Sequence, residues 1–257
     1  MYNTLVVIPA RLEASRLPGK PMVDIAGKPM IEHVWRQACA AETGRVVVAT
    51  DAEEVFGAIR SCGGEAVMTR SDHMSGSDRV FEAVNKVDPD GSAEFIVNLQ
   101  GDLPTLEPRL VDACLAPLRQ KGPHISTLAA PITDMAERDD PNAVKVVGSP
   151  LPDIERPFGK LSVMRALYFS RGAVPWGDGP LFHHIGIYGY RRSALERFVT
   201  LRPSALEKRE RLEQLRALED EMRIDVAIVD TVPIGVDTPE DLAKARRHLG
   251  AVDAQAR

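Results

Sequence analysis

The sequence predicts an α/β fold with a largely parallel sheet, and three features of its first half indicate this. Short apolar runs rich in Val and Ile indicate buried strands. Segments of helical length, apolar on one face, separate these runs. Strands that alternate with helices form βα units, whose strands pair in parallel. The predicted strands cover residues 5–9, 45–50, 66–69 and 95–100, and the predicted helices cover 30–41, 52–62, 75–87 and 108–120.

Local signals support these helices individually. In the first, Ile31, Val34 and Ala38 recur at i, i+3 and i+7 and therefore share one face. Gly63 and Gly64 end the second helix, because glycine favours the left-handed turn that follows a helix.

The second half breaks this alternation and predicts a smaller α+β portion. Thr238 before Pro239 is expected to cap the closing helix. We expect one domain over residues 1–257, with an α+β subregion at about residues 125–220. The predicted elements are strands at 125–130, 143–147 and 225–229, an irregular Pro-rich segment at 148–159, β-rich chain at 167–190, a charged helix at 205–222, a closing helix at 239–249 and a frayed tail at 251–257.

Composition excludes several classes of protein. The chain has 257 residues and a formal net charge of −5, so it lacks the broad basic field of a general nucleic-acid binder. Cys39, Cys62 and Cys114 form no CxxC pair, which argues against a zinc ribbon or a disulfide framework. Neither a membrane-spanning run nor a signal peptide is apparent, so we expect a cytoplasmic protein without membrane partners.

The loop after the first strand carries Arg11, Arg16 and Lys20. Loops at the carboxyl ends of parallel strands form the binding sites of open α/β sheets, and fixed cations there suit a polyphosphate. The loop contains neither a Walker motif nor a GxGxxG fingerprint. The alternative is an ordinary solvated surface loop.

Two carboxylates are candidates for a metal site. Asp102 follows the strand at 95–100, and Asp237 follows the apolar stretch 233–236, which we expect to be a strand. Mg²⁺ typically binds one or two carboxylates, waters and substrate phosphates. Alternatively, Asp102 caps the turn before Pro104 and Asp237 belongs to the helix start.

Other polar residues carry weaker signals. The segment 71–79 could contact a base or ribose, or serve as an ordinary helix entry. His184, Tyr188 and Tyr190 alternate along a predicted strand and share one face, which indicates either a pocket wall or packing. The charged helix is expected to be a solvated surface helix.

Several blocks of the chain, in this order, resemble the CMP-Kdo synthetases, which are 3-deoxy-manno-octulosonate cytidylyltransferases. The blocks are VVIPARLEASRLPGKPMVDIAGKPMIEHV, VATD, MTRSDHMSGSDR, IVNLQGDLP, ALYFSR, HHIGIYGYR, LEQLRALE and GVDTPEDL, which together extend over nearly the whole chain. The resemblance implies a Rossmann-like nucleotidyltransferase three-layer sandwich with a smaller α+β sugar-binding and dimerisation portion. It also implies a homodimer that transfers CMP from CTP to Kdo with Mg²⁺, for lipopolysaccharide synthesis.

The resemblance also implies roles for individual residues. Arg11, Lys20, Asp102 and Asp237 would be catalytic, with the two aspartates as metal ligands. The residues implied to contact the nucleotide are Arg11 and Lys20 together with Pro9, Ala10, Arg70, Ser75, Gly76 and Gln100. The residues implied to contact the sugar acid are Arg171, His184, Tyr188, Glu213 and Gln214.

The chain departs from the family pattern at three places. Leu103 replaces the usual acidic residue after Asp102, His183 stands where Arg or Lys is common, and the loop between Trp176 and His183 is short. The alternatives are a cytidylyltransferase for another acidic sugar, such as 8-amino-Kdo or an acylneuraminate, and a catalytically silent nucleotide-binding module. The preference for CTP over UTP stays open.

Overall fold

The structure, a computed structural model, describes residues 3–12, 17–156 and 159–255. Its chain forms two compact units. The first comprises residues 1–111 and 233–257, and the second comprises residues 112–232, which include the predicted α+β subregion.

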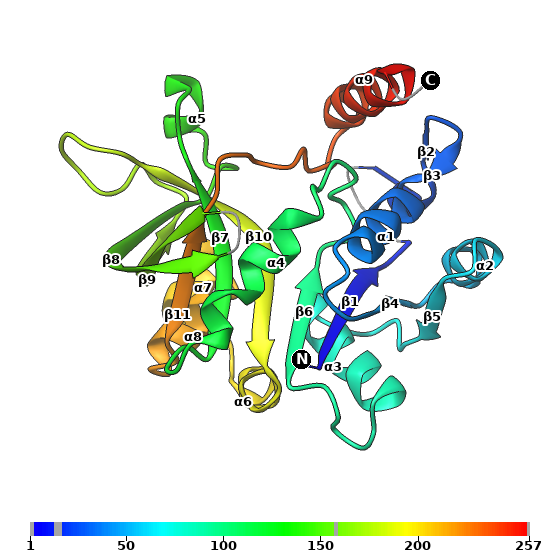
Figure 1. Cartoon of the computed structure of the whole chain (residues 1–257), viewed down its shortest axis with the longest axis horizontal. Coiled ribbons are helices and arrows are strands. Elements are labelled where there is room, and N and C mark those ends of the chain that lie inside the picture. The colour runs from blue at the N-terminus through cyan, green and yellow to red at the C-terminus, as the bar shows by residue number, and fades with distance from the viewer. Residues whose placement is uncertain (1–2, 13–16, 157–158, 256–257) are drawn as a thin grey trace. The chain divides into compact units, whose positions relative to one another are not determined.

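The first unit contains the predicted parallel sheet. Its strands lie in the order β5 (Glu65–Met68), β4 (Arg45–Thr50), β1 (Thr4–Ala10) and β6 (Phe95–Leu99), and each neighbouring pair is parallel. Helices α1 (Met30–Ala40) and α2 (Glu53–Ser61) cover one face, and α3 (Gly76–Val87) covers the other (Figure 1). The predicted α/β class and its three layers are therefore confirmed in this unit.

The C-terminal segment completes the first unit. Helix α9 (Pro239–Gln255) packs through Leu242, Ala245 and Leu249 on Ile25 and Met30. Ile25 belongs to a short ribbon of β2 (Asp24–Ile25) and β3 (Lys28–Pro29), which the sequence did not predict. The helix continues to Gln255, so the tail predicted to fray from residue 251 is helical up to that point.

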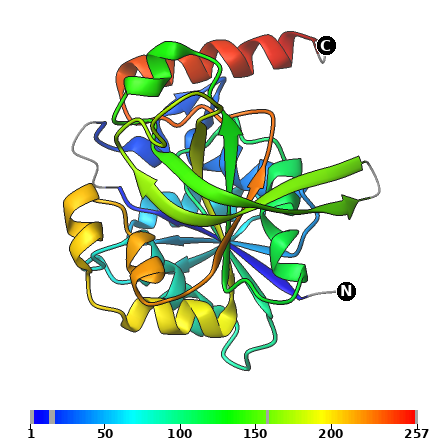
Figure 2. The same cartoon turned by 90° about the vertical axis from the view of Figure 1, so that its left-hand side faces the viewer.

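The second unit is built on a curled sheet. Its strands lie in the order β10 (Phe182–Arg191), β7 (Ile125–Pro131), β11 (Ile224–Ile228), β9 (Gly159–Ser170) and β8 (Lys145–Arg156). Among the strand pairs of this unit whose register is described, only β7 and β11 are parallel. Strand β8 also pairs with β10, through Lys145 and His183. Figure 2 shows β8 and β9 as a long hairpin. The helical elements of this unit include α5 (Met135–Asp139), α6 (Arg192–Thr200), α7 (Ala205–Glu210) and α8 (Leu215–Glu219).

Three predicted elements are wrong. The segment 148–159 was predicted to be irregular, but its residues 148–156 belong to β8, and Gly159 begins β9. Residues 157 and 158 lie outside the described residues. The helix predicted at 205–222 is divided into α7 and α8 at Arg211, which adopts a left-handed φ of 57°. The helix predicted at 108–120 ends as α4 (Arg109–Leu115), and Pro117 starts a separate 3₁₀ turn, since proline lacks the N–H that a continuing helix needs.

Candidate active site

A cavity of about 300 Å³ lies in the first unit beyond the carboxyl ends of β1 and β6. This is the edge at which parallel sheets bind ligands. The predicted residues that line it are Pro9, Ala10, Arg11, Lys20, Ser75, Gly76, Gln100, Asp102 and Asp237. Arg70 does not line it, and Arg16 lies outside the described residues.

Glycines allow the walls of this cavity to approach closely. A Cβ on Gly101 would lie 2.9 Å from the carbonyl oxygen of Pro9, so no larger residue fits between β1 and the end of β6. A Cβ on Gly76 would lie 3.7 Å from the Pro9 ring and 3.8 Å from both polar atoms of the Gln100 amide. The start of α3 therefore lies against β1 and Gln100.

Lys20 joins the two predicted metal ligands. Its Nζ lies 2.7 Å from Oδ2 of Asp102 and 2.8 Å from Oδ1 of Asp237. The Lys20 side chain is only 15% exposed. Burial lowers the pKa of Lys20, but Asp102 and then Asp237 outweigh it, so the net shift of this pKa is upward. The ammonium group therefore stays charged between the carboxylates.

The backbone brings these three residues together. Gly19 precedes Lys20 in the left-handed region, with φ 67°, and so turns the chain at the start of the 3₁₀ turn Lys20–Met22. The Val236 N–H donates to the carbonyl of Asp102 at 2.9 Å, and the Ile234 N–H donates to Oγ1 of Thr105 at 2.7 Å. These two bonds hold the segment before Asp237 beside the segment after β6.

The prediction that Asp237 follows a strand is wrong, because the structure assigns no strand to residues 229–238. The chain here is held by the two bonds to residues 102 and 105 instead of a ladder. The predicted cap is confirmed: Oγ1 of Thr238 accepts from the Asp241 N–H at 3.2 Å. Asp241 in turn accepts from the Thr238 N–H at 3.0 Å. Asp237 therefore lies both at a helix start and at the cavity.

The carboxylate pair has the composition of a small-cation site. Among the described residues, no group of three or more His, Cys, Asp or Glu side chains could hold a metal ion. Asp102 and Asp237 thus offer two oxygen ligands, which matches the usual protein share of a Mg²⁺ site. The position of the Lys20 ammonium shows that positive charge is accommodated between them.

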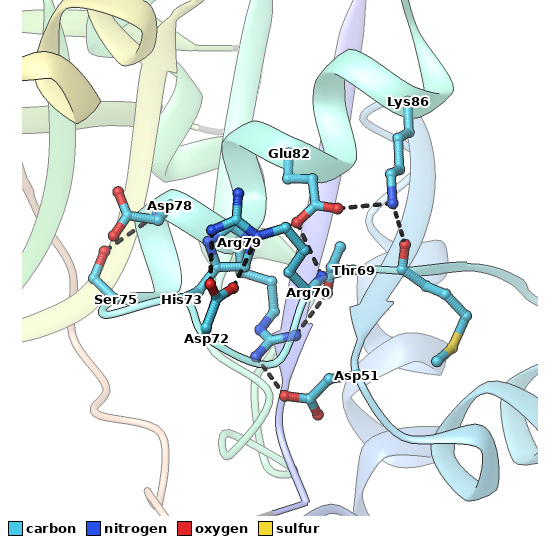
Figure 3. Close-up of polar contacts among 11 residues, drawn as sticks. Asp51, Thr69, Arg70, Asp72, His73, Ser75, Asp78, Arg79, Glu82 and Lys86 are labelled. Carbon is cyan, nitrogen blue, oxygen red and sulfur yellow. Dashed lines mark hydrogen bonds and ion pairs between the residues drawn. The ribbon is translucent and has the colours of Figure 1, made fainter.

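Helix α3 and the loop before it form another wall of the cavity. Ser75 caps the helix by accepting from the Asp78 N–H at 3.2 Å. Figure 3 shows the polar contacts that surround this loop. Arg70 pairs with Asp72 at 2.8 Å, and both side chains are 68% exposed. Gln100 donates from Nε2 to Oδ1 of Asn98 at 3.0 Å.

The predicted sugar contacts all belong to the second unit. His184 and Tyr188 lie on β10 with their ring centroids 5.4 Å apart, and Phe169 of β9 meets the His184 ring edge-on at 4.9 Å. Burial raises the pKa of Tyr188 well above its usual value, so its hydroxyl stays protonated. The rings on this face therefore pack together, as the alternative interpretation of the pattern expected.

Hydrogen bonding fixes the tautomer of His184. The Thr127 hydroxyl lies 2.7 Å from the carbonyl of Ile187 and 3.1 Å from that of Ile185. Carbonyls only accept, so the hydroxyl proton is used there. Nε2 of His184, 3.0 Å from the same oxygen, must then donate to it. In the neutral ring, Nδ1 is left as an acceptor.

Acid is expected to destabilise the chain through His184. Burial lowers the pKa of His184 from 6.5 to about 3. Between these values the unfolded chain binds a proton that the folded chain does not. The contribution of His184 to stability is therefore complete above pH 6.5 and falls as the pH drops toward 3, by up to about 1.4 kcal/mol per pH unit. Urea unfolding of the wild-type chain and of His184→Gln from pH 7 to pH 4 checks this. The variant should show the shallower dependence, and equal slopes would contradict the assignment.

The remaining predicted sugar contacts lie near the break between α7 and α8. Arg171 donates from Nε to the carbonyl of Glu210 at 2.8 Å and from Nη1 to that of Pro141 at 2.9 Å. Glu213 lies 3.7 Å from Arg216. Gln214 is 6% exposed, and its buried Nε2 has no hydrogen-bond partner among the described residues. A buried donor without an acceptor is costly and indicates a place for a ligand atom.

The structure adds residues that the sequence did not single out. Arg79 is 3% exposed, lines the cavity and pairs with Asp51 at 2.7 Å. Lys145 is fully buried in the second unit and donates to the carbonyls of Asp140 and Ala143 at 2.7 Å. A buried cation leaves no pattern in sequence, because Arg and Lys are usually exposed.

Two of the departures from the family pattern have a structural account. Leu103 is 9% exposed, and a Cβ on Gly235 would lie 3.8 Å from it, so it packs against the segment that leads to Asp237. His183 pairs through Nδ1 with Glu137.

None of the described helices is long and apolar enough to span a membrane.

Comparison with known proteins places this geometry in a family. A family model described as Cytidylyltransferase matches residues 5–224. The 3-deoxy-manno-octulosonate cytidylyltransferase of Azorhizobium caulinodans is 60% identical over 251 residues, which cover 98% of this chain and 97% of the relative. The enzyme of the same name from Rhizobium meliloti is 60% identical over 249 residues, or 97% and 96% of the two chains.

Solved structures agree with these relatives. A CMP:2-keto-3-deoxy-manno-octonic acid synthetase complexed with CTP superposes with a TM-score of 0.87 at 40% identity, covering 97% of this chain and 99% of the other. The 4-diphosphocytidyl-2C-methyl-D-erythritol synthase of Anaerococcus prevotii, with a TM-score of 0.64 and 14% identity over 97% and 99% of the chains, shares the fold alone. The predicted family and fold are confirmed: this chain belongs to the 3-deoxy-manno-octulosonate cytidylyltransferase family.

Proposed function

We propose that this chain transfers CMP from CTP to the anomeric hydroxyl of Kdo and releases pyrophosphate. One observation carries the proposal: the cavity at the strand ends combines the cations Arg11 and Lys20 with the converging carboxylates Asp102 and Asp237. A nucleoside triphosphate needs both, since its charge must be neutralised while its α-phosphate is held for attack.

The nucleotide would lie along the cavity. Pro9, Ala10, Ser75, Gly76 and Gln100 would contact the cytidine, and Arg70, which lies outside the cavity wall, would need to move to join them. Arg11 and Lys20 would bind the phosphates. The sugar hydroxyl would attack the α-phosphorus in line, so that a new O–P bond forms, the bond to the β-phosphate oxygen breaks and the hydroxyl proton passes to solvent. Arg11 and Lys20 would then stabilise the charge on the departing pyrophosphate.

The carboxylate pair fits Mg²⁺, and we propose that Asp102 and Asp237 hold it. Their oxygens already face one cation, the Lys20 ammonium, at 2.7 and 2.8 Å. When bound, Mg²⁺ would neutralise phosphate charge and lower the pKa of the attacking hydroxyl. Lys20 would give up at least one of its carboxylate contacts and turn to the phosphates.

The sugar acid would be recognised by residues of the second unit. The Nδ1 atom of His184 offers an acceptor for a sugar hydroxyl. The Nε2 atom of Gln214, which no described residue accepts from, offers a donor. Arg171, Tyr188 and Glu213 would complete these contacts. The neutral state of His184 at pH 7 suits recognition of hydroxyl groups, whereas Arg171 supplies the charge for a carboxylate.

Replacing Gln214 by Met should separate binding from stability. The variant removes a buried donor that lacks an acceptor, so the free energy of unfolding should stay the same or rise by about 1 kcal/mol. The KM for Kdo should rise about tenfold, because one hydrogen bond to the substrate is lost. Kinetics with varied Kdo and urea unfolding measure the two effects. A lower stability with unchanged KM would make Gln214 a packing residue.

Pyrophosphate release in the presence of CTP and Mg²⁺ tests the proposed function. Kdo, 8-amino-Kdo and N-acetylneuraminate should be supplied separately, with UTP in place of CTP as a further arm. Release with Kdo and CTP is the expected result. Release only with another acid would keep the chemistry and change the substrate. If no pyrophosphate is released with any of the three acids although CTP binds measurably, the result would favour a nucleotide-binding module.

We also propose a homodimer that acts in the cytoplasm and whose product serves lipopolysaccharide synthesis. The support for these points is the resemblance to the CMP-Kdo synthetases. Light scattering coupled to size-exclusion chromatography measures the assembly, and a mass of one chain would contradict the dimer.

A further inference from the structure

The loop that precedes α3 is held from the helix side by two side chains one turn apart. Arg79 donates from Nη1 to Oγ1 of Thr69 at 2.6 Å, at the start of the loop. Glu82 accepts from the Arg70 N–H at 3.0 Å and also pairs with Nε2 of His73. Figure 3 shows these residues on the helix and loop. We call residues 69–75 the α3 loop.

Arg79 also ties this loop to the parallel sheet. Its Nη2 lies 2.7 Å from Oδ2 of Asp51, the residue after β4. Thr69 directly follows β5, and its N–H donates to the carbonyl of Thr50 at 2.8 Å. One guanidinium group therefore connects the carboxyl ends of two strands to the first turns of α3. The side chains of Arg79 and Asp51 are only 4% and 14% exposed.

The Glu82 carboxylate is likewise hydrogen-bonded to several partners. Its carboxylate binds the Lys86 ammonium at 2.7 Å as well as the α3 loop, and its side chain is 17% exposed. Burial raises the pKa of Glu82, but Lys86, the Arg70 N–H and His73 together lower it from 4.5 to about 2. The carboxylate is therefore charged throughout the neutral range and accepts all of these bonds at once.

The α3 loop and the helix start form one wall of the cavity. His73, Ser75, Gly76 and Arg79 line it, and so does Met74, which is 91% exposed. Apolar packing therefore does not fix Met74. The polar contacts of Arg79 and Glu82, together with the Ser75 cap, hold the backbone of this wall.

Buried ion pairs contribute little to stability compared with apolar packing of the same volume, because both charges lose their hydration. Such pairs can instead specify one geometry. In this chain the geometry that the pair specifies is a wall of the nucleotide cavity.

We propose that Arg79 and Glu82 are positioning residues for CTP, which hold the α3 loop at the distance that the nucleotide requires. The inference rests on the proposed function, because CTP is the ligand of that cavity. Neither residue needs to touch the nucleotide. A displacement of a wall by about 1 Å is enough to weaken binding or turnover by up to a hundredfold.

The chain contains a matched control at the opposite end of the same elements. Arg45 pairs with Glu65 and donates to the carbonyl of Val87 at 2.8 Å. It therefore connects the amino ends of β4 and β5 to the end of α3, away from the cavity. Arg79→Lys and Arg45→Lys each remove a guanidinium group that joins the same three elements.

Calorimetric titration of CTP into each full-length variant tests the proposal, with thermal unfolding measured in parallel. Arg79→Lys should weaken CTP binding at least tenfold, and Glu82→Gln about threefold to tenfold, at temperatures where both are folded. Arg45→Lys should bind CTP within twofold of the wild-type chain. At saturating CTP, kcat of Arg79→Lys should recover to within about threefold, as expected for a residue that acts on binding.

Hydrogen exchange of the α3 loop supplies a second readout that needs no nucleotide. Its amides should exchange faster in Arg79→Lys and Glu82→Gln than in Arg45→Lys. Wild-type CTP affinity in Arg79→Lys and Glu82→Gln, or an equal loss in Arg45→Lys, would overturn the proposal. If the wild-type chain binds CTP but releases no pyrophosphate with any sugar acid, the transferase function fails while the affinity comparison still decides the positioning role. If it binds no CTP, both fail.

Discussion

Replacing Asp102 by Asn is expected to slow pyrophosphate release by about a hundredfold or more while the fold persists. The substitution removes one of the two negative charges that would hold Mg²⁺, a contribution of several kcal/mol to the transition state. The fold should persist because the carbonyl of Asp102, not its side chain, accepts from the Val236 N–H. Lys20 also keeps its contact with Asp237.

The Mg²⁺ dependence of the Asp102→Asn variant is the decisive measurement. Half-maximal activity should require a higher Mg²⁺ concentration than in the wild-type chain. Asp112→Asn is a suitable control, because Asp112 is likewise a carboxylate that pairs with cations, Arg119 and Arg156. Its side chain is 32% exposed compared with 31% for Asp102. An unaltered Mg²⁺ dependence in Asp102→Asn would remove Asp102 from the metal site.

Replacing Lys20 by Met is expected to lower the rate by about a hundredfold to a thousandfold, as the loss of one group that stabilises transition-state charge does. The same change leaves Asp102 and Asp237 facing each other without the ammonium that now lies between them. Mg²⁺ alone should therefore raise the midpoint of thermal unfolding of the variant more than that of the wild-type chain.

These two readouts for Lys20 distinguish its possible roles. Near-normal turnover in Lys20→Met would contradict its assignment to the phosphates. A lost activity with the same Mg²⁺ response as the wild-type chain would keep the phosphate role but would mean that the ammonium does not compete with the metal. Lys20→Arg, which keeps the charge, should recover part of the stabilisation.

The regular βα elements were predictable because their signals are local. The strand at 45–50 and the helix from Gly76 to Val87 have the predicted bounds within one residue, since apolar runs and a Ser cap mark them. The continuation of β8 beyond residue 147 was not predicted, because Pro150 and Pro152 suggest irregular chain. Proline is tolerated there because β8 ends the strand order, and an edge strand can leave N–H positions unused.

The break between α7 and α8 shows another limit of local signals. Leu212, Leu215 and Leu218 follow Arg211 at helical spacing, yet Arg211 takes a left-handed conformation usually adopted by Gly or Asn. Arg216 turns back to pair with Glu207 at 2.5 Å, so a contact across the break decides the conformation. The helical periodicity of a sequence does not indicate such a contact.

The candidate site was predicted in its residue types but not in its connections. The positions of Asp102 and Asp237 before turns and helices were visible in sequence, whereas the bridge through Lys20 depends on folding. Arg79 was inconspicuous because a cation in the first turns of a helix usually faces water. Its burial is explained by its hydrogen bonds to Asp51 and Thr69, which follow β4 and β5.

The order in which the chain is made has a consequence for when the protein can work. The first unit is discontinuous, and residues 112–232 are synthesised before its last segment. Lys20 can meet Asp102 after 82 residues, but its contact with Asp237 spans 217 residues. A nascent chain that has left the ribosome only as far as β11 therefore contains Asp102 but not yet Asp237. The proposed metal site is therefore complete only after residue 237 has been synthesised, and we expect a chain that terminates after residue 232 to be inactive.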